Sequence, residues 1–256
     1  MPLALNLALF GLTMAVFLVL ERRWPAVSSR PLEVAVNATA GLLTLLIQLS
    51  APWWSVAETA LINLAGGGWI DLRPLPLWMG ALVYFVAADF GEYLFHRAQH
   101  RFGWMWAMHS LHHSDTAMNT LTTLRHFWLE PVVKSVTIWL AVALLFKADA
   151  QILAVYGVIG LLNFFTHSNL RLGFGRFSWV LNSPQYHRLH HGENPAHHNA
   201  NFAALLPIFD VLFGSYHVPA RDEFPPTGLG GEATATATDV LVWPFKAAQV
   251  EQPTES

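Results

Sequence analysis

The chain has 256 residues, of which 54% are hydrophobic and only 12% are charged, about half the charged fraction of an average soluble domain. The formal net charge of −3 is small, so composition gives no electrostatic case for a nucleic-acid partner. The chain contains no cysteine, which excludes disulfides and thiolate metal sites, so any metal ion must be held by nitrogen and oxygen atoms.

The composition indicates a membrane protein, and the first apolar stretch fits this interpretation. Residues 2–20 carry no charge and are close to the length that crosses a bilayer as a helix. Arg22 and Arg23 follow the stretch, and because positive charge gathers on the cytoplasmic side, they place its end in the cytoplasm. A signal peptide is disfavoured, since its positive charge would precede the apolar run.

Four further apolar stretches predict an all-α bundle of membrane helices. The stretch at 34–64 is interrupted by Pro52, which indicates either one kinked span or a span plus an interfacial piece, and we count one crossing. The stretch at 77–95 returns the chain to the cytoplasmic side. Two shorter stretches, 132–146 and 152–165, predict either tilted spans or a re-entrant hairpin. We therefore expect about four or five spans.

The order of these stretches also divides the chain. Residues 1–75 are expected to form amino-terminal membrane helices, and residues 76–218 a histidine-rich domain. The chain turns polar after residue 218, which predicts a surface tail over 219–256, with residues 240–245 touching the membrane interface.

Three histidine clusters follow the apolar stretches. Within a cluster the spacing of three or four residues places side chains on one helix face, about 5 to 6 Å apart, where they can converge on one ion. The clusters are HRAQH with His96 and His100, HSLHH with His109, His112 and His113, and HRLHH with His187, His190 and His191. Eight histidines exceed the four ligands of a tetrahedral ion, which indicates two ions, or one ion with additional supporting histidines. Arginines near all three clusters mark one cytoplasmic face, so we expect a cytoplasmic, histidine-rich metal-binding cap.

Carboxylates near these histidines would offset the charge of a metal ion. Asp89 and Glu92 precede His96 by seven and four residues on the same helix face, and we expect them to accept histidine N–H groups. The alternative for Asp89 is a structural role, either as a cap or in an ion pair with an arginine such as Arg97. A structural role is expected for three isolated histidines, His126, His198 and His217.

In this order and spacing, the clusters resemble the three histidine boxes of the fatty acid hydroxylase superfamily, the membrane di-iron proteins that include the sterol desaturases. Residues 89–100 are similar to the family pattern of an aspartate, an aromatic-rich helix and HR. FTHSN at 165–169 resembles its histidine-plus-asparagine segment, and NANFAALLPIFDVLFGSY at 199–216 resembles its closing motif. Two positions differ, since Asn199 stands where aspartate is common and His126 precedes a phenylalanine that more often comes first.

The resemblance implies that the eight cluster histidines bind two iron ions and that His167 is a further ligand. It leaves His126, His197 and His198 unassigned. Supporting positions around the ligands are expected for Asp89, Glu92, Asn199, Asn201 and Asp210.

The implied activity is that of an O2-dependent membrane oxidoreductase, which hydroxylates or desaturates a C–H bond of a sterol, fatty acyl chain or related lipid. Electrons are expected from an external reductase or electron carrier, because the chain has no dinucleotide fingerprint and no cysteine for an iron–sulfur centre.

Other functions are open from the residues alone. Imidazole also suits zinc, so a zinc-dependent membrane hydrolase is an alternative, although such sites usually use three protein ligands. Metal transport would need ligands at mid-depth of the membrane, and a non-catalytic haem protein needs one or two axial ligands. We expect a multi-pass protein of a bacterial inner membrane with the metal site facing the cytoplasm, or of the endoplasmic reticulum in a eukaryote.

Overall fold

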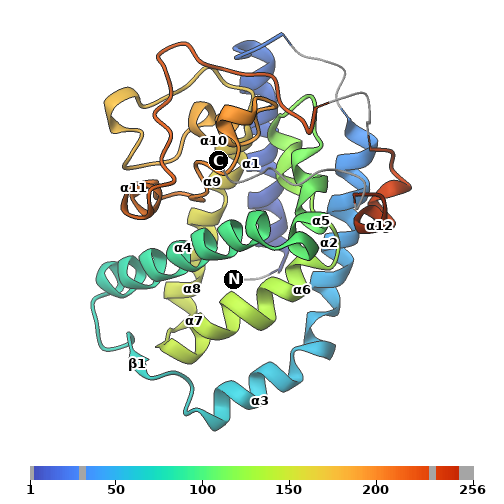
Figure 1. Cartoon of the computed structure of the whole chain (residues 1–256). Coiled ribbons are helices and arrows are strands. Elements are labelled where there is room, and N and C mark those ends of the chain that lie inside the picture. Colours follow the sequence, from blue (N-terminus) through green and yellow to red (C-terminus); the bar gives the residue numbers. More distant parts are fainter. Residues whose placement is uncertain (1–2, 29–32, 231–234, 248–256) are drawn as a thin grey trace.

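The computed structural model describes residues 3–28, 33–230 and 235–247, and these residues are mostly helical (Figure 1). The longer helices are α1 (Leu3–Arg23), α2 (Val34–Trp54), α3 (Val56–Leu64), α4 (Leu77–Arg101), α5 (Gly103–His113) and α8 (Ala150–Gly160). The shorter ones are α6 (Glu130–Lys134), α7 (Leu140–Leu145), α9 (Leu162–His167), α10 (Pro184–His190), α11 (Ile208–Phe213) and α12 (Trp243–Ala247). Single helical turns are η1 (Thr120–Leu124), η2 (Ser135–Trp139), η3 (Gly175–Phe177), η4 (Pro195–His197) and η5 (Asp239–Leu241). Two short strands, β1 (Ile70–Asp71) and β2 (Phe146–Lys147), pair in parallel.

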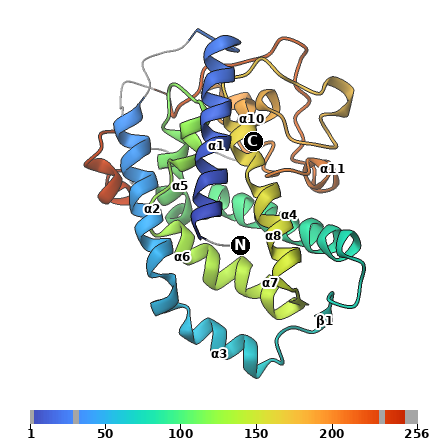
Figure 2. The same cartoon turned by 180° about the vertical axis from the view of Figure 1, so that it is seen from behind.

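Some of the longer helices run side by side, and others cross them. Figures 1 and 2 show α1, α2 and the α8–α9 pair running alongside one another, while α4 crosses them near the middle. Helices α10 and α11 lie towards one end of the molecule and α3 lies at the other. The carboxyl ends of α4, α5 and α9 therefore meet the loops around α10 in the half of the molecule away from α3.

Two helical stretches, Val34–Trp53 and Ala150–His167, are long and apolar enough to cross a membrane. Only 17% and 22% of their residues, respectively, are buried within the chain. Leu12 and Val19 of α1 extend this exposed apolar surface. Contact with water would be unfavourable over such an area, so it requires lipid or another apolar cover. Of the expected four or five spans, these two meet both criteria within the described residues.

Two of the helices that lead to the histidines begin at a capping residue. The carboxylate of Asp149 accepts the N–H groups of Gln151 and Ile152, both at 2.9 Å, and starts α8. The hydroxyl of Ser183 accepts the N–H of Tyr186 at 3.3 Å and starts α10. Because the first turn of α10 is fixed in this way, the direction in which its histidines project is fixed as well.

Part of the carboxyl-terminal segment, for which the sequence predicts a polar surface tail, packs against α5. Val240 and Trp243 are buried in one apolar cluster with Met108 and Leu111. The indole N–H of Trp243 donates to the hydroxyl of Ser110 at 2.9 Å. A few apolar side chains in a polar segment were sufficient to cover the outer face of α5. Residues 231–234 and 248–256 of the expected tail lie outside the described residues.

Candidate metal centre

Four helices, α4, α5, α9 and α10, converge and bring together histidines from four parts of the chain. In each case the histidines stand in the last turns of the helix or directly after it. Their candidate ligand atoms form two groups, and within each group these atoms lie within 4.8 Å of one another. The first group is His96, His100, His109, His113 and His190, and the second is His112, His167, His187 and His191. The structure therefore brings together all nine histidines that the sequence predicts as ligands.

The groups do not follow the three clusters. His113 belongs to the first group and the adjacent His112 to the second. Likewise His190 belongs to the first group and His191 to the second. Adjacent helical residues project about 100° apart, so one cluster supplies two neighbouring positions rather than converging on a single one. Helices α5 and α10 thus contribute to both groups.

Many of the ring nitrogens that face the interior of the groups have no polar partner other than another ring. In the second group, Nε2 of His167 lies 3.0 Å from Nε2 of His112 and 2.9 Å from Nε2 of His187. Among the described residues, no hydrogen-bond partner is found for three buried Nε2 atoms of the first group, those of His96, His109 and His190. A buried polar atom without a partner costs about 1–3 kcal/mol. A cation among these nitrogens would satisfy them, so the donor set fits a metal.

The opposite side of several rings is held by the backbone. Four Nδ1–H groups donate to main-chain carbonyls, those of His96 to Phe202 at 2.7 Å, His190 to Ala200 at 2.8 Å, His167 to Asn163 at 2.8 Å and His112 to Arg125 at 3.3 Å. A carbonyl can only accept, so the proton is on Nδ1 and the lone pair is on Nε2. These bonds orient the rings and set the tautomer that a metal ligand needs.

Glu130, at the start of α6, is the carboxylate that contacts the histidines. Its Oε2 accepts the amide N–H of Gln99 at 2.7 Å and lies 3.4 Å from Nδ1 of both His109 and His126. Its Oε1 accepts the N–H of Phe127 at 3.0 Å. Burial alone would raise the pKa of Glu130, but the hydrogen bonds from His109 and His126 outweigh it and lower the pKa. Sequence reasoning missed this residue, whose signal is an acid at the boundary of an apolar stretch.

Two of the expected supporting acids lie apart from the histidine N–H groups. The carboxylate of Asp89 accepts the backbone N–H groups of Leu205 and Leu206 at 3.1 and 2.9 Å. Glu92 accepts the ammonium of Lys134 at 2.7 Å. In the described structure Asp89 therefore fastens the segment after the third cluster to α4, and Glu92 joins α4 to α6.

Asp210 supports the centre through the backbone. Its carboxylate accepts the N–H groups of Phe202 and Ala203, both at 2.8 Å, and the hydroxyl of Tyr186. The carbonyl of the same Phe202 holds the ring of His96. Asp210 consequently fixes a residue that orients a candidate ligand.

The two asparagines of the closing motif shape the same loop. Asn199 and Asn201 have positive φ angles of 57° and 60°, a conformation that asparagine tolerates better than most residues. The Ala200 carbonyl between them accepts Nδ1–H of His190. The side chain of Asn199 also forms a hydrogen bond with His100. This loop is therefore the support of the first group on the side away from α5.

Burial controls the charge of the histidines. Burial, and then the neighbouring histidines, lower the pKa of His112, His113 and His191 well below the usual value. Burial also lowers the pKa of His190, to about 3. These rings are neutral at physiological pH, which is the form that binds metal.

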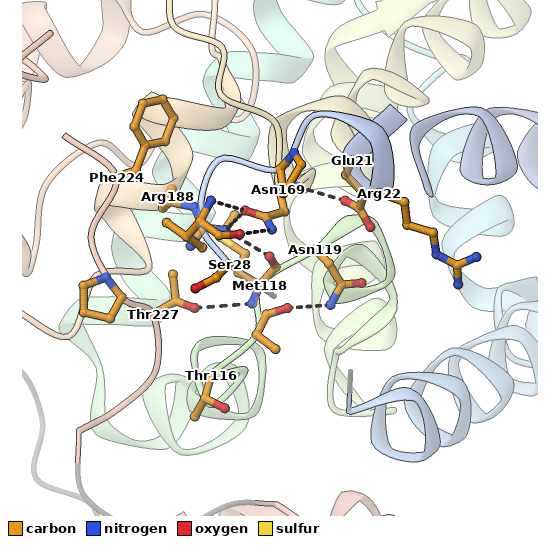
Figure 3. A pocket seen from close by; sticks show the side chains of 14 residues that line it. Glu21, Arg22, Ser28, Thr116, Met118, Asn119, Asn169, Arg188, Phe224 and Thr227 are labelled. Carbon is orange, nitrogen blue, oxygen red and sulfur yellow. Dashed lines mark hydrogen bonds between the residues drawn. The ribbon is translucent and has the colours of Figure 1, made fainter. Parts of the chain in front are cut away.

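A cavity of about 690 Å³, lined by both polar and apolar side chains, lies beside this centre (Figure 3). Glu21, Asn169 and Arg188 line it, and none of the nine histidines does. The guanidinium of Arg188 donates to the side-chain oxygen of Asn169 at 2.9 Å and to the carbonyl of Met118 at 3.0 Å. These hydrogen bonds fix the polar part of the cavity wall, which α10 and the residues after α9 form.

Comparison with known proteins gives a family match over the same region. The fatty acid hydroxylase family model matches residues 81–215, which include all nine histidines. An alkylglycerol monooxygenase of Xenopus tropicalis is 32% identical over 223 residues, covering 87% of this chain and 43% of the relative. An ornithine lipid hydroxylase of Rhizobium tropici is 28% identical over 177 residues, covering 69% of this chain and 53% of the relative. A very-long-chain aldehyde decarbonylase of Oryza sativa subsp. indica is 24% identical over 205 residues, covering 75% of this chain and 28% of the relative.

The chain spans about half the length of these relatives, or less. No solved structure matches it significantly.

Proposed function

The chain belongs to the fatty acid hydroxylase family, and from this premise we propose that it is an O2-dependent di-iron oxidoreductase that hydroxylates or desaturates a C–H bond of a lipid. The family and the relatives support lipid oxidation at a membrane. The observation that carries the finer proposal is the gathering of nine histidines into groups of five and four. Residues 76–218 form the catalytic domain in this proposal.

Each histidine group holds one ion in this proposal. The first group would bind its ion between α4, α5 and α10, and the second between α5, α9 and α10. Bound iron would supply the redox chemistry that activates O2 towards an unactivated C–H bond. A zinc hydrolase is less well supported, because its catalytic ion usually takes three protein ligands and both groups offer more.

The contribution of the chain is orientation, charge and exclusion of water. The carbonyls of Phe202, Ala200 and Asn163 orient three rings, and Glu130 adds a negative charge beside His109. Burial of most of the rings keeps water from the reacting atoms, which limits side reactions of a strong oxidant.

Hydroxylation of a C–H bond by O2 consumes two electrons and two protons and yields an alcohol and one water. The electrons come from an external reductase or electron carrier in this proposal, because the chain has no cysteine for an iron–sulfur centre.

The proposed substrate is a lipid that enters laterally from the membrane. The named relatives act on alkylglycerols, ornithine lipids and very-long-chain aldehydes, which share long apolar chains. The exposed apolar surfaces of α1, α2 and α8 would contact the same lipid layer, as part of a bundle of about four or five spans. Arg97, Arg101 and Arg171 favour a cytoplasmic position for the metal centre, in a bacterial inner membrane or the endoplasmic reticulum.

The test measures metal and product on the same protein. We expect two iron ions per chain in mild detergent, coupled to each other in the Mössbauer spectrum of iron-57-enriched protein. With a reductant and 18O2, membrane lipids should gain one 18O atom or lose two hydrogens by mass spectrometry. One zinc ion per chain, or lipids unchanged by the iron-loaded protein, would contradict the proposal.

Two substitutions assign the site. His112→Asn and His190→Asn, one from each group, should lower the iron content and reduce product formation at least about 100-fold, because each removes a ligand. His198→Asn is the matched control, because His198 belongs to neither group. Full activity in both ligand variants would refute the assignment.

A further inference from the structure

A third group of candidate ligands lies outside the two histidine groups. It consists of His197 in η4, His217 after α11, and Glu223, with candidate ligand atoms within 4.8 Å of one another. Nε2 of His197 lies 3.1 Å from Oε1 of Glu223. The rings of His197 and His217 have centroids 5.2 Å apart and are nearly perpendicular. None of these residues belongs to the proposed di-iron centre.

We propose that His197, His217 and Glu223 form a separate metal site that binds one divalent transition-metal ion such as zinc. Two imidazoles and one carboxylate are a donor set that suits zinc and other first-row divalent ions. This site does not depend on the proposed function, because it shares no residue with the two histidine groups.

The carboxylate of Glu223 is already oriented for this role. Its Oε2 accepts the backbone N–H of Ala220 at 2.9 Å, which leaves Oε1 facing His197. The backbone carbonyl of Glu223 accepts the side-chain amide of Gln185 at 3.3 Å. The acid is thus fixed on both its side chain and its main chain, so little freedom is lost when an ion binds.

His197 occupies a prepared position as well. Its residue is only 6% exposed. The ring packs against Gly192, where a Cβ atom would approach Nδ1 to 2.9 Å. Glycine therefore leaves the space that the ring fills, and Nε2 is the nitrogen that faces Glu223.

The distances suit an ion after a small adjustment. Ligand atoms around a tetrahedral zinc ion are about 3.3 Å apart, given bonds of about 2.0 Å. The separation of 3.1 Å between His197 and Glu223 is close to this value. The Glu223 side chain is 28% exposed, so a water molecule can reach the fourth position.

An ion here would join the segment after α10, which carries His197, to the segment after α11, which carries His217 and Glu223. Both segments support the proposed catalytic centre. Gly192 already bridges to Thr227, and Asn201 forms hydrogen bonds with both the N–H and the carbonyl of His217. The loop between them carries the carbonyl of Ala200, which orients His190. The ion would therefore hold in place the loop whose Ala200 carbonyl orients His190 of the first histidine group.

The test counts zinc ions on the intact chain. The full-length protein in detergent is stripped with a chelator, loaded with Zn²⁺ and analysed by native mass spectrometry and elemental analysis. We expect His217→Asn and Glu223→Gln each to hold one ion fewer per chain than the wild type. His198→Asn, which alters a neighbouring histidine outside the group, should hold the wild-type number. Equal zinc content in all four proteins would overturn the proposal and leave only a hydrogen-bonded His197–Glu223 pair.

The wild type alone gives a second test that does not depend on the variants folding. Saturating Zn²⁺ should give three ions per chain if both histidine groups are filled, and X-ray absorption should then detect an oxygen ligand in addition to nitrogen. Saturation without any carboxylate-ligated ion would overturn the proposal. Failure of the di-iron proposal has a different signature, because His112→Asn would then leave the zinc count unchanged while the deficit of His217→Asn stayed at one.

Discussion

Glu130 is a buried acid that brings a negative charge to the histidine centre and orients His109. Its Oε2 faces donors from Gln99, His109 and His126, and these bonds keep the carboxyl ionised. In Glu130→Gln, the amide NH₂ cannot accept hydrogen bonds from these donors. If the amide oxygen faces them instead, it accepts the bonds but carries no negative charge. We expect a loss of metal affinity of about 10- to 100-fold, the range typical for residues that orient a metal ligand. Competition with a chromophoric iron chelator would measure it.

The matched control for Glu130 is Glu92→Gln. Glu92 is also an acid on a helix near the histidines, but it accepts the ammonium of Lys134. Its replacement should leave the metal affinity close to that of the wild type. Equal affinities for Glu130→Gln and Glu92→Gln would contradict the role given to Glu130.

At the scale of the element, the loop at 199–202 depends on an unusual backbone. Asn201 is buried with φ of 60°, and its side chain bonds both the N–H and the carbonyl of His217. Both Asn201→Gly and Asn201→Ala lose the side-chain bonds, but glycine adopts the left-handed conformation without strain, whereas it costs alanine about 1 kcal/mol or more. We expect the alanine variant to unfold at lower denaturant concentration than the glycine variant. An alanine variant as stable as the glycine variant would show that the loop adopts another conformation.

The junction of α2 and α5 depends on a fully buried arginine. Arg125 donates to Glu33 at 2.6 Å, to the carbonyl of Leu111 at 2.9 Å and to the hydroxyl of Ser114 at 2.7 Å. Arg125→Met would leave the carboxylate of Glu33, only 14% exposed, without its charged partner. We expect the free energy of unfolding to fall by about 3–5 kcal/mol, as for other broken buried ion pairs. Chemical denaturation in detergent would measure this change.

Arg73→Met provides the comparison for the Arg125 variant. Arg73 pairs with Asp71 at 2.6 Å, but both side chains are largely exposed to solvent. Water screens an exposed pair, so its removal should change stability little. If the two methionine variants unfold at the same denaturant concentration, the arginine network does not stabilise the junction.

For the whole molecule, local spacing was sufficient to predict the histidines. Histidines three and four residues apart share a helix face wherever the helix lies, so the eight cluster histidines could be chosen before any packing was known, whereas His167 followed from the family resemblance alone. The apolar stretches likewise correspond to helices, and α4 continues to Arg101 so that it includes His96 and His100. What the spacing could not predict is how adjacent histidines divide between two groups.

The missed features depend on contacts between distant parts of the chain. Glu130 lies 21 residues after His109, and the carbonyl of Phe202 lies 106 residues after His96. Asp89 binds the backbone 116 residues later instead of a histidine on its own helix. No periodic pattern reports such pairings, because they follow from how the helices pack. For the same reason the packing of Trp243 on α5 was not expected from a polar tail.

Metal removal tests whether the two histidine groups also stabilise the fold. Without ions, buried ring nitrogens face one another at distances such as 2.9 Å between His167 and His187, and several have no hydrogen-bond partner in the described structure.

An ion present at about 1,000 times its dissociation constant stabilises the folded state by about 4 kcal/mol. This corresponds to roughly 10 °C in the unfolding midpoint of a chain of this size. Because chelation removes an ion from each group, we expect it to lower the midpoint by about twice that amount, as followed by circular dichroism in detergent. Added Fe²⁺ should restore it and Mg²⁺ should not, because magnesium prefers oxygen ligands. A midpoint unchanged by chelation would mean that helix packing alone holds the nine rings in place, and that their convergence does not depend on metal.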